Sequence, residues 1–395
     1  MKVLLINKFH YKKGGAETYY FELAKLLQKA GHKVIFFSMQ SKKNEQCAYD
    51  KYFVSNKEYV EKTSFVDKIK AAKTIVYSKE AYFKISELIK KEKPNLAILN
   101  NIHRQLTTSI IDALYENNVK IYWVVHDLIL LCPNYTMLDS HFQICEKCCN
   151  GNYFKCVEKK CIKNSYLKSF LAYREAKFNR KRNLINKISM FITPSIFYKD
   201  KLLEYGFNSS KVRYIPNPIS VPDAINIFKG DYCLYFGRLS REKGIDDLIR
   251  ACGATGTKLL ILGTGPFEDE LKDLVKEANY DNIVFGGFCS GDKLTTAIQK
   301  SFFVVLPSKW YENCPYSAIE AMILGKPLIV SNNGGLPELV NNGYNGFIFN
   351  DIDELVNILS SIKKDLNYND LCQNSYKKAD ELFNENKYLD RLFSK

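Results

Sequence analysis

The chain has 395 residues, which is enough for two domains that each bury their own core. Apolar residues make up 46% of it, and no apolar run reaches the roughly 18 residues needed to span a bilayer, so the composition excludes a disordered chain and a helical membrane protein. A formal net charge of +14 indicates an anionic partner, although lysine is abundant throughout. Nucleic acid, anionic lipid headgroups and phosphorylated substrates are the candidates.

In the first half of the chain, apolar runs alternate with helical stretches, as in parallel sheets covered by helices. Residues 1–6 are too short for the apolar region of a signal peptide and lead straight into several lysines, so we expect the first strand of a cytoplasmic protein. Residues 17–29 have the apolar spacing of a helix. The strands expected in this half are 3–6, 34–37, 96–99 and 121–125.

A second series of strands follows the segment 215–222, which we interpret as a domain linker because it contains three prolines. The strands expected there are 232–236, 259–262, 283–285, 303–306 and 328–330. We therefore predict an α/β protein with two Rossmann-like parallel-sheet domains. These domains span residues 1–215 and 223–375, and a charged helical tail follows at 376–395.

Two polar motifs follow expected strands of the first half. Gly14 and Gly15 lie between the first strand and its helix, where a backbone without side chains can approach a ligand closely. The G-x-G-x-x-G dinucleotide fingerprint is absent, and a plain turn is an equally good interpretation. His126 and Asp127 follow the strand 121–125, at the end where parallel sheets bind ligands.

A basic loop follows the first strand of the second half. The strand 232–236 ends at Gly237, and Arg238 and Lys243 come next. Two fixed cations can stabilise the negative charge that develops on a departing diphosphate. The alternative is that both are solvated surface charges.

Two carboxylates, Glu312 and Glu320, are separated by seven residues. We expect Glu312 in a strand-to-helix loop and Glu320 in the second turn of a helix that begins near Pro315. The backbone around Pro315, Tyr316 and Ser317 forms an anion site at this helix start, although proline itself has no N–H to donate. The carboxylates would accept hydrogen bonds from hydroxyls on either side of the anion. A ligand with diol, diphosphate and diol in sequence is a nucleotide sugar.

Together these motifs resemble family-four retaining glycosyltransferases of the GT-B fold. The resemblance rests on five motifs in order, which are Gly14-Gly15, His126-Asp127, the G-R-L-S-R-E-K-G loop of 237–244, E-x7-E at 312–320, and G-G-L-P-E at 334–338. It covers nearly the whole chain. It implies two domains that face a cleft, with the tail 376–395 packing back on the first domain.

The resemblance also implies roles for the second-half residues. Arg238 and Lys243, next to Gly237, would clamp the donor diphosphate, and no metal or other cofactor is needed for catalysis. Glu320 would bind the nucleotide ribose, and Glu312 would lie near the donor sugar or the diphosphate. The donor would be linked to UDP or GDP.

In the first half, the loop of Gly14-Gly15 would lie near the donor phosphate and the acceptor, with Glu17 beside it. His126 would contact the donor sugar. Asp127 would orient the acceptor or cap the following segment. His103 is a weaker candidate on the acceptor side.

The cysteines are concentrated, with six of twelve between Cys132 and Cys161. Their C-x2-C and C-x4-C pairs are compatible with a structural zinc site of Cys145, Cys148, Cys156 and Cys161. Reduced thiols are the alternative, since disulfides are rare in cytoplasmic proteins. The sequence Asp351-Ile352-Asp353 is explained by helix capping, and we assign it no metal.

Two basic helical regions, 166–190 and 62–93, interleave aromatic and cationic residues. Such stretches bind anionic membranes, although an amphipathic helix packed on a core is an equal alternative. We expect a cytoplasmic enzyme, peripheral on the inner face of the membrane, that extends a lipid-linked oligosaccharide for a bacterial capsule or surface polysaccharide. The rivals are a nucleotide-sugar epimerase of the same fold and a non-enzymatic membrane- or RNA-binding protein. The sequence has no common RNA-binding signature, so no nucleic-acid partner is expected.

Overall fold

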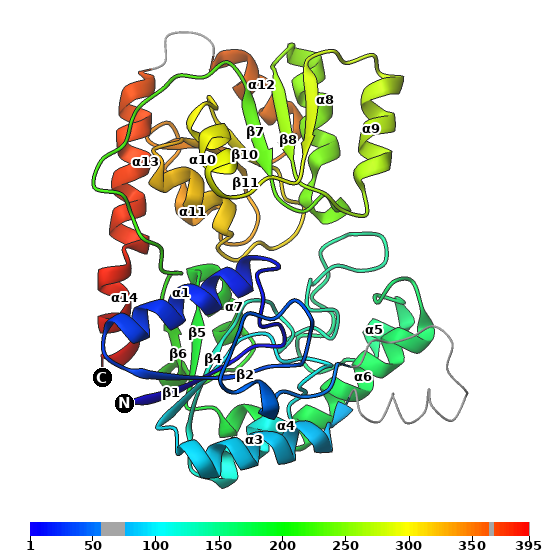
Figure 1. The fold of residues 1–395 in the computed structure, drawn as a ribbon. Coiled ribbons are helices and arrows are strands. Elements are labelled where there is room, and N and C mark those ends of the chain that lie inside the picture. The colour runs from blue at the N-terminus through cyan, green and yellow to red at the C-terminus, as the bar shows by residue number, and fades with distance from the viewer. Residues whose placement is uncertain (57–75, 363–366, 395) are drawn as a thin grey trace. The chain divides into compact units, whose positions relative to one another are not determined.

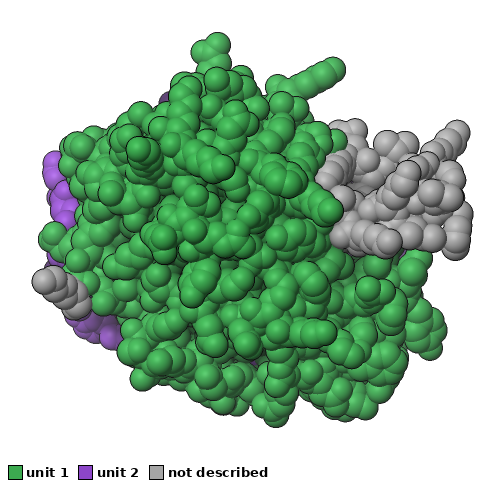
Figure 2. Space-filling view, turned by 90° about the horizontal axis from the view of Figure 1, so that it is seen from below, with its two compact units in different colours: residues 1–218, 389–395 green, residues 219–388 purple. Residues whose placement is uncertain are grey.

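The computed structural model describes residues 1–56, 76–362 and 367–394. The chain divides into two compact units (Figures 1 and 2), of which unit 1 comprises residues 1–218 and 389–395 and unit 2 comprises residues 219–388. The first boundary falls inside the proline-rich segment 215–222. The charged tail is two helices, α13 (Tyr368–Phe383) and α14 (Glu385–Phe393), and the chain re-enters unit 1 at Leu389.

Unit 1 contains a six-stranded sheet in the order β2-β1-β3-β4-β5-β6, in which every pair is parallel. The strands are β1 (Lys2–Ile6), β2 (Lys33–Phe37), β3 (Leu96–Leu99), β4 (Lys120–Val124), β5 (Met190–Thr193) and β6 (Val212–Tyr214). The sequence did not lead us to expect β5 and β6, because they are short and β5 adjoins a stretch interpreted as one amphipathic region.

The helices of unit 1 lie on both sides of its sheet. Figure 1 shows α1 on one side, and α3 and α4 on the other. The described helices are α1 (Gly15–Lys29), α3 (Lys79–Glu92), α4 (Ser109–Glu116), α5 (Lys155–Glu158), α6 (Tyr166–Lys181) and α7 (Ile196–Glu204), with short 3₁₀ turns η1 (Asp50–Tyr52), η2 (Leu184–Lys187) and η3 (Ser209–Lys211). Part of the basic region 62–93 lies outside the described residues.

Unit 2 contains a second parallel sheet in the order β12-β11-β10-β7-β8-β9. Its strands are β7 (Cys233–Phe236), β8 (Leu259–Leu262), β9 (Ile283–Gly287), β10 (Val304–Leu306), β11 (Leu328–Ser331) and β12 (Gly346–Phe349). Its other helices are α8 (Ile245–Thr255), α9 (Glu268–Glu277), α10 (Gly291–Gln299), α11 (Tyr316–Ile323) and α12 (Ile352–Ser361), with 3₁₀ turns η4 (Arg241–Lys243) and η5 (Pro337–Leu339). The prediction of two parallel α/β sheets is confirmed.

The strand order of unit 2 also locates a ligand crevice. The chain leaves β7 in one direction toward β8 and β9 and then returns to β10 on the other side of β7. In open parallel sheets, ligands bind beyond the carboxyl ends of the strands at such a reversal point. The loops that follow β7 and β10 are therefore the first place to look for function.

Two smaller features bear on earlier expectations. Asp351 is the N-cap of α12, and its Oδ1 accepts a hydrogen bond from the Glu354 backbone N–H at 2.9 Å, so the Asp-Ile-Asp sequence is a helix cap. Among the helices in the described ranges, none is both long and apolar enough to cross a bilayer.

Candidate functional site

The basic loop after β7 and the glutamate loop after β10 lie side by side in unit 2. They are about seventy residues apart in sequence, and they meet because β7 and β10 are neighbours in the sheet. The Lys309 backbone N–H donates to the Glu242 carbonyl at 2.8 Å, and the Lys309 ammonium pairs with Asp246 and Asp247 at 2.9 Å. These contacts fix one loop against the other.

An ion pair between Lys243 and Glu312 joins the two loops. Lys243 Nζ lies 2.6 Å from Glu312 Oε1, and Ser308 Oγ donates to the same oxygen at 2.6 Å. Burial would raise the pKa of Glu312, but the cation and the hydrogen bonds outweigh it and hold the pKa below its ordinary value. Glu312 is therefore an ionised carboxylate that fixes the position of the Lys243 ammonium.

Arg238 differs from Lys243 in its surroundings. It is exposed, and no ion pair to its guanidinium occurs in the part of the chain that the structure describes. Its carbonyl accepts a hydrogen bond from the buried Tyr235 hydroxyl at 2.9 Å, which holds the backbone just after β7. Arg238 thus presents an uncompensated positive charge at the reversal point of the sheet.

Glycines allow the backbone to come close at this site. Gly237 has a φ of +150°, and its carbonyl oxygen would lie 1.8 Å from a Cβ on Gly263. Gly334 has a φ of +66°, and a Cβ there would lie 2.2 Å from the Glu312 carbonyl oxygen. The neighbouring Gly335 N–H donates to that same oxygen at 2.7 Å. The G-G-L-P-E motif therefore supports the backbone of Glu312, which only a residue without a side chain permits at position 334.

Glu320 lies in the second turn of α11, as the spacing predicts. It is half-buried, and burial raises its pKa to about 7. No hydrogen bond to its carboxylate occurs among the described residues. Pro315 is the N-cap of α11 and its side chain makes no capping hydrogen bond, while Tyr316 is buried and Ser317 is half-buried in its first turn. A helix start that follows the loop holding the Lys243 ammonium is suited to an anion.

In unit 1, His126 lies two residues after the buried end of β4. Its Nε2 lies 2.9 Å from Asn100 Oδ1, and Asn100 Nδ2 donates to the Ile6 carbonyl at 3.2 Å. This orientation of the amide makes Asn100 Oδ1 the acceptor, so Nε2 carries the proton and Nδ1 is left as an acceptor. Burial lowers the pKa of His126 to about 3. The imidazole is therefore neutral and suited to hydrogen bonding rather than to charge stabilisation.

A second polar group surrounds the start of α1. Gly14 is the N-cap and Gly15 is the first helical residue, and both are exposed. Glu17 is buried and accepts a hydrogen bond from Asn7 Nδ2 at 3.0 Å. Burial raises the pKa of Glu17, which Asn7 and the nearby Lys8 partly oppose.

The remaining sequence candidate of this region, Asp127, caps the segment after it. Its Oδ1 accepts a hydrogen bond from the Ile129 backbone N–H at 3.1 Å. Burial lowers the pKa of the nearby Lys8 ammonium, while Asp127 acts in the opposite direction. Of the two roles considered for Asp127, the structure supports capping.

The cysteines are arranged differently from the predicted zinc set. Cys148, Cys156 and Cys161 pack in a small apolar cluster with Ile162 and Ala172. Thiol hydrogen bonds pair Cys132 with Cys148 and Cys156 with Cys161, whereas Cys145 is not part of this cluster. Within residues 1–56, 76–362 and 367–394, no group of three or more His, Cys, Asp or Glu side chains is placed to hold a metal ion. The geometry gives the four-cysteine site no support, and zinc binding stays a prediction.

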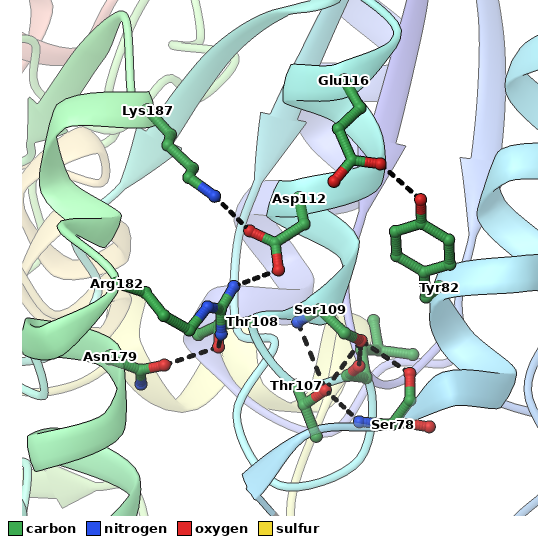
Figure 3. A network of polar contacts seen from close by, with 11 residues as sticks. Ser78, Tyr82, Thr107, Thr108, Ser109, Asp112, Glu116, Asn179, Arg182 and Lys187 are labelled. Atoms are coloured by element: carbon green, nitrogen blue, oxygen red, sulfur yellow. Dashed lines mark hydrogen bonds and ion pairs between the residues drawn. The ribbon is translucent and has the colours of Figure 1, made fainter.

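Part of the basic region 166–190 serves the fold. Figure 3 shows Asp112 of α4 between Arg182 and Lys187. Lys187 Nζ lies 2.5 Å from Asp112 Oδ1, and Arg182 pairs with Oδ2. The apolar residues Tyr166, Leu167 and Phe170 at the start of α6 are exposed, and so is Ile185 in η2. Most of the exposed apolar groups that this region offers to a membrane therefore lie in its N-terminal part.

Sequence reasoning missed several residues that shape the site. Asn100, which directly follows β3, and Lys8, two residues after β1, were not considered as site residues, although the carboxyl ends of these strands were expected to bind ligands. Ser308, two residues after β10, was also missed. A search for polar residues just after each expected strand would have found all three.

Comparisons with known proteins agree with these features. Residues 13–221 match the family model described as "Glycosyltransferase Family 4", and residues 223–380 match the model described as "Glycosyl transferases group 1". An uncharacterised 42.6 kDa protein in the cps region of Klebsiella pneumoniae is 24% identical over 91% of this chain and 92% of its own length. The uncharacterised glycosyltransferase MJ1607 of Methanocaldococcus jannaschii is 40% identical, but the match covers only 29% of this chain and 30% of that protein.

Solved structures share the whole fold. Anabaena Alr3699/HepE in complex with UDP has a TM-score of 0.70 at 18% identity, with 99% of this chain and 98% of that chain covered. The lipopolysaccharide outer core galactosyltransferase WaaB in its apo form has a TM-score of 0.66 at 16% identity, with 100% and 99% covered. At these identities the likeness concerns the fold, and the expected GT-B architecture of two Rossmann-like sheets is confirmed.

Proposed function

The chain belongs to glycosyltransferase family 4, and from that premise we propose that it transfers a sugar from a nucleotide-sugar donor to a carbohydrate acceptor with retention of anomeric configuration. The observation that carries this proposal is the meeting of two loops in unit 2. They place Arg238, the Lys243–Glu312 pair and Glu320 at the reversal point of a parallel sheet. HepE, which shares the fold, was solved with UDP bound.

The donor would lie across these loops. The diphosphate faces Arg238 and Lys243, and the amides at the start of α11 add to the positive field. Glu320 accepts hydrogen bonds from the ribose hydroxyls. Glu312 holds Lys243 and lies beside the donor sugar or diphosphate.

The chemistry follows from where charge develops. As the bond between the anomeric carbon and the diphosphate oxygen breaks, negative charge grows on the leaving oxygen. Arg238 and Lys243 stabilise this charge without having to reorganise, because the Glu312 pair already fixes Lys243. No step in this scheme requires a metal ion.

Neutral His126 provides a hydrogen-bonding group for a sugar hydroxyl in unit 1. Because Nε2 is occupied by Asn100, its Nδ1 would accept a hydrogen bond from that hydroxyl. The acceptor's attacking hydroxyl would lose its proton to the departing phosphate, so no protein general base is assigned.

We place the acceptor among lipid-linked oligosaccharides of capsule or surface polysaccharide synthesis. The full-length likeness to a cps-region protein supports this choice. So does a patch at the starts of α5 and α6. It is made of the exposed residues Phe154, Tyr166, Leu167 and Phe170, and the exposed cations Lys163 and Lys168 adjoin it in sequence. Such a patch would bind peripherally to an anionic cytoplasmic leaflet.

Thermal shift with UDP, GDP and their sugar conjugates tests the donor assignment, with EDTA present throughout. Stabilisation by one nucleotide series in wild type, and its loss in Arg238→Ala, is the expected result. Glu277→Gln, an exposed carboxylate on α9, is the control. If a folded protein shows no shift with any nucleotide, the donor site is refuted. Donor epimerisation without an acceptor would instead favour the epimerase alternative.

A further inference from the structure

Unit 1 contains a second concave site that the proposed donor chemistry does not use. It is a cavity of about 460 Å³ beside β4 and α6, and the segment 129–133 that follows His126-Asp127 forms part of its wall. Other lining side chains are His103, Trp123, Glu175, Asn179 and Arg180. Its volume lies within the range of about 300–1,000 Å³ that is typical of small-molecule sites.

Buried polar atoms in this cavity have no hydrogen-bond partner. Glu175 is 4% exposed, and its Oε1 has none. Both ring nitrogens of His103 are likewise unpartnered, and its Nδ1 lies 3.6 Å from Glu175 Oε1, beyond a good hydrogen bond. A buried polar group without a partner destabilises the folded protein, because it has lost its hydrogen bonds to water. The unpartnered Glu175 carboxylate and His103 imidazole therefore indicate a site where a polar ligand supplies the missing hydrogen bonds.

The surrounding contacts fix these groups in place. The His103 ring stacks on Trp123 with centroids 5.6 Å apart, so its plane is set. Glu175 and Asn179 are one turn apart on α6, and therefore share a face. Asn179 Oδ1 accepts from Thr108 Oγ1 at 2.6 Å (Figure 3), which leaves the Asn179 amide N–H groups as donors.

Arg180 is held at the wall of the cavity. Its Nη1 donates to the Asn150 carbonyl at 3.2 Å. A Cβ on Gly151 would lie only 1.0 Å from that nitrogen, so a glycine there makes room for the guanidinium. The site therefore combines a carboxylate acceptor, amide and guanidinium donors, and an imidazole that does either.

This mixture selects the chemistry of the ligand. The Glu175 carboxylate would repel a phosphate, and the Arg180 guanidinium would repel an ammonium, so the cavity disfavours a ligand with a single charge of either sign. A neutral ligand with several hydroxyls matches, because each hydroxyl both donates and accepts. We propose that the cavity binds a sugar residue of the carbohydrate acceptor, so that Glu175 and His103 determine which acceptor is used. This inference rests on the proposed function.

Saturation-transfer difference NMR on the full chain tests the cavity without knowledge of the natural acceptor. The probes are the methyl glycosides of glucose, galactose, mannose, rhamnose and N-acetylglucosamine. We expect at least one glycoside to bind wild type, about tenfold weaker binding in Glu175→Gln, and none in Ala176→Leu, which fills the cavity. Binding should persist in the exposed-carboxylate control Glu158→Gln and in Arg238→Ala.

Thermal melting of each variant shows that it is folded, and Ala176→Leu keeps the test decisive if Glu175→Gln unfolds. Absence of binding by every glycoside, or equal binding in wild type and Ala176→Leu, would overturn the proposal and leave a cavity that holds water only. The two proposals can fail separately. If wild type binds a nucleotide but no glycoside, only the proposal for the cavity is refuted. If wild type binds no nucleotide, the proposed donor site is refuted.

Discussion

The pH dependence of donor binding should follow the ionisation of Glu320. Burial raises its pKa to about 7, so the carboxyl group is protonated below that pH and ionised above it. Ribose hydroxyls donate to the ionised carboxylate, and a protonated carboxyl offers a weaker acceptor. Donor affinity should therefore rise with pH through about 7.

The expected size of the effect follows from the ionised fraction. With a pKa of about 7, roughly one tenth of the carboxylates are ionised at pH 6 and roughly nine tenths at pH 8. If only the ionised form binds, affinity at pH 8 exceeds that at pH 6 by about tenfold, or about 1.4 kcal/mol. Glu320→Gln, which cannot ionise, should bind more weakly at pH 8 and show a flat profile.

Isothermal titration calorimetry with UDP-glucose and GDP-mannose measures this directly. The intact nucleotide sugar is preferable to the free diphosphate, because the terminal phosphate of the free diphosphate titrates in the same pH range. Glu277→Gln should keep the wild-type slope. A flat wild-type profile, or a slope that survives in Glu320→Gln, would refute the assignment of this carboxylate to the ribose.

Three further predictions concern the two loops and the surface. Lys243→Met should lower the free energy of unfolding by about 3 kcal/mol in chemical denaturation, because it leaves buried Glu312 without its cation. Adding Glu312→Gln to this variant should recover part of that loss. If the effects of the two substitutions on the free energy of unfolding simply add, the coupling between the two residues is contradicted. Gly334→Ala should abolish nucleotide binding in the calorimeter and lower the melting temperature more than the control Gly343→Ala. At Gly343 φ is also positive, at +76°, but a Cβ meets nothing within 4 Å. An equal loss of melting temperature in both variants would refute the close approach of Gly334 to Glu312. Leu167→Glu should reduce sedimentation with phosphatidylglycerol vesicles severalfold without changing nucleotide binding, and unchanged sedimentation would exclude α6 as the contact.

Much of the fold could be predicted because parallel strands are buried on both faces. Residues 96–99 and 259–262 are continuous apolar runs, and both are strands with these bounds. β6 has only three residues, two of them half-buried, so its sequence carries no apolar run to detect. Its place at the edge of the sheet explains the weak signal.

The site could be predicted only in part, for a related reason. Spacing placed Glu312 in a loop and Glu320 on a helix, because local patterns fix both. Sequence alone did not show that Glu312 binds Lys243, since that contact depends on the neighbouring positions of β7 and β10. The His103 and Glu175 pair was equally hidden, because it forms only when α6 packs beside the residues that follow β3.

The most direct test of the central claim is to follow an α-linked nucleotide-sugar donor by proton NMR in the presence of wild-type enzyme and the panel of methyl glycosides. Consumption of the donor with a new α-anomeric signal, lost in Arg238→Ala and in Glu312→Gln, is the result that a retaining transferase with its donor site in unit 2 predicts. A β-anomeric product would contradict retention. The donor site in unit 2 would be contradicted if the donor is not consumed although an acceptor binds, or if turnover is unchanged in Arg238→Ala and Glu312→Gln.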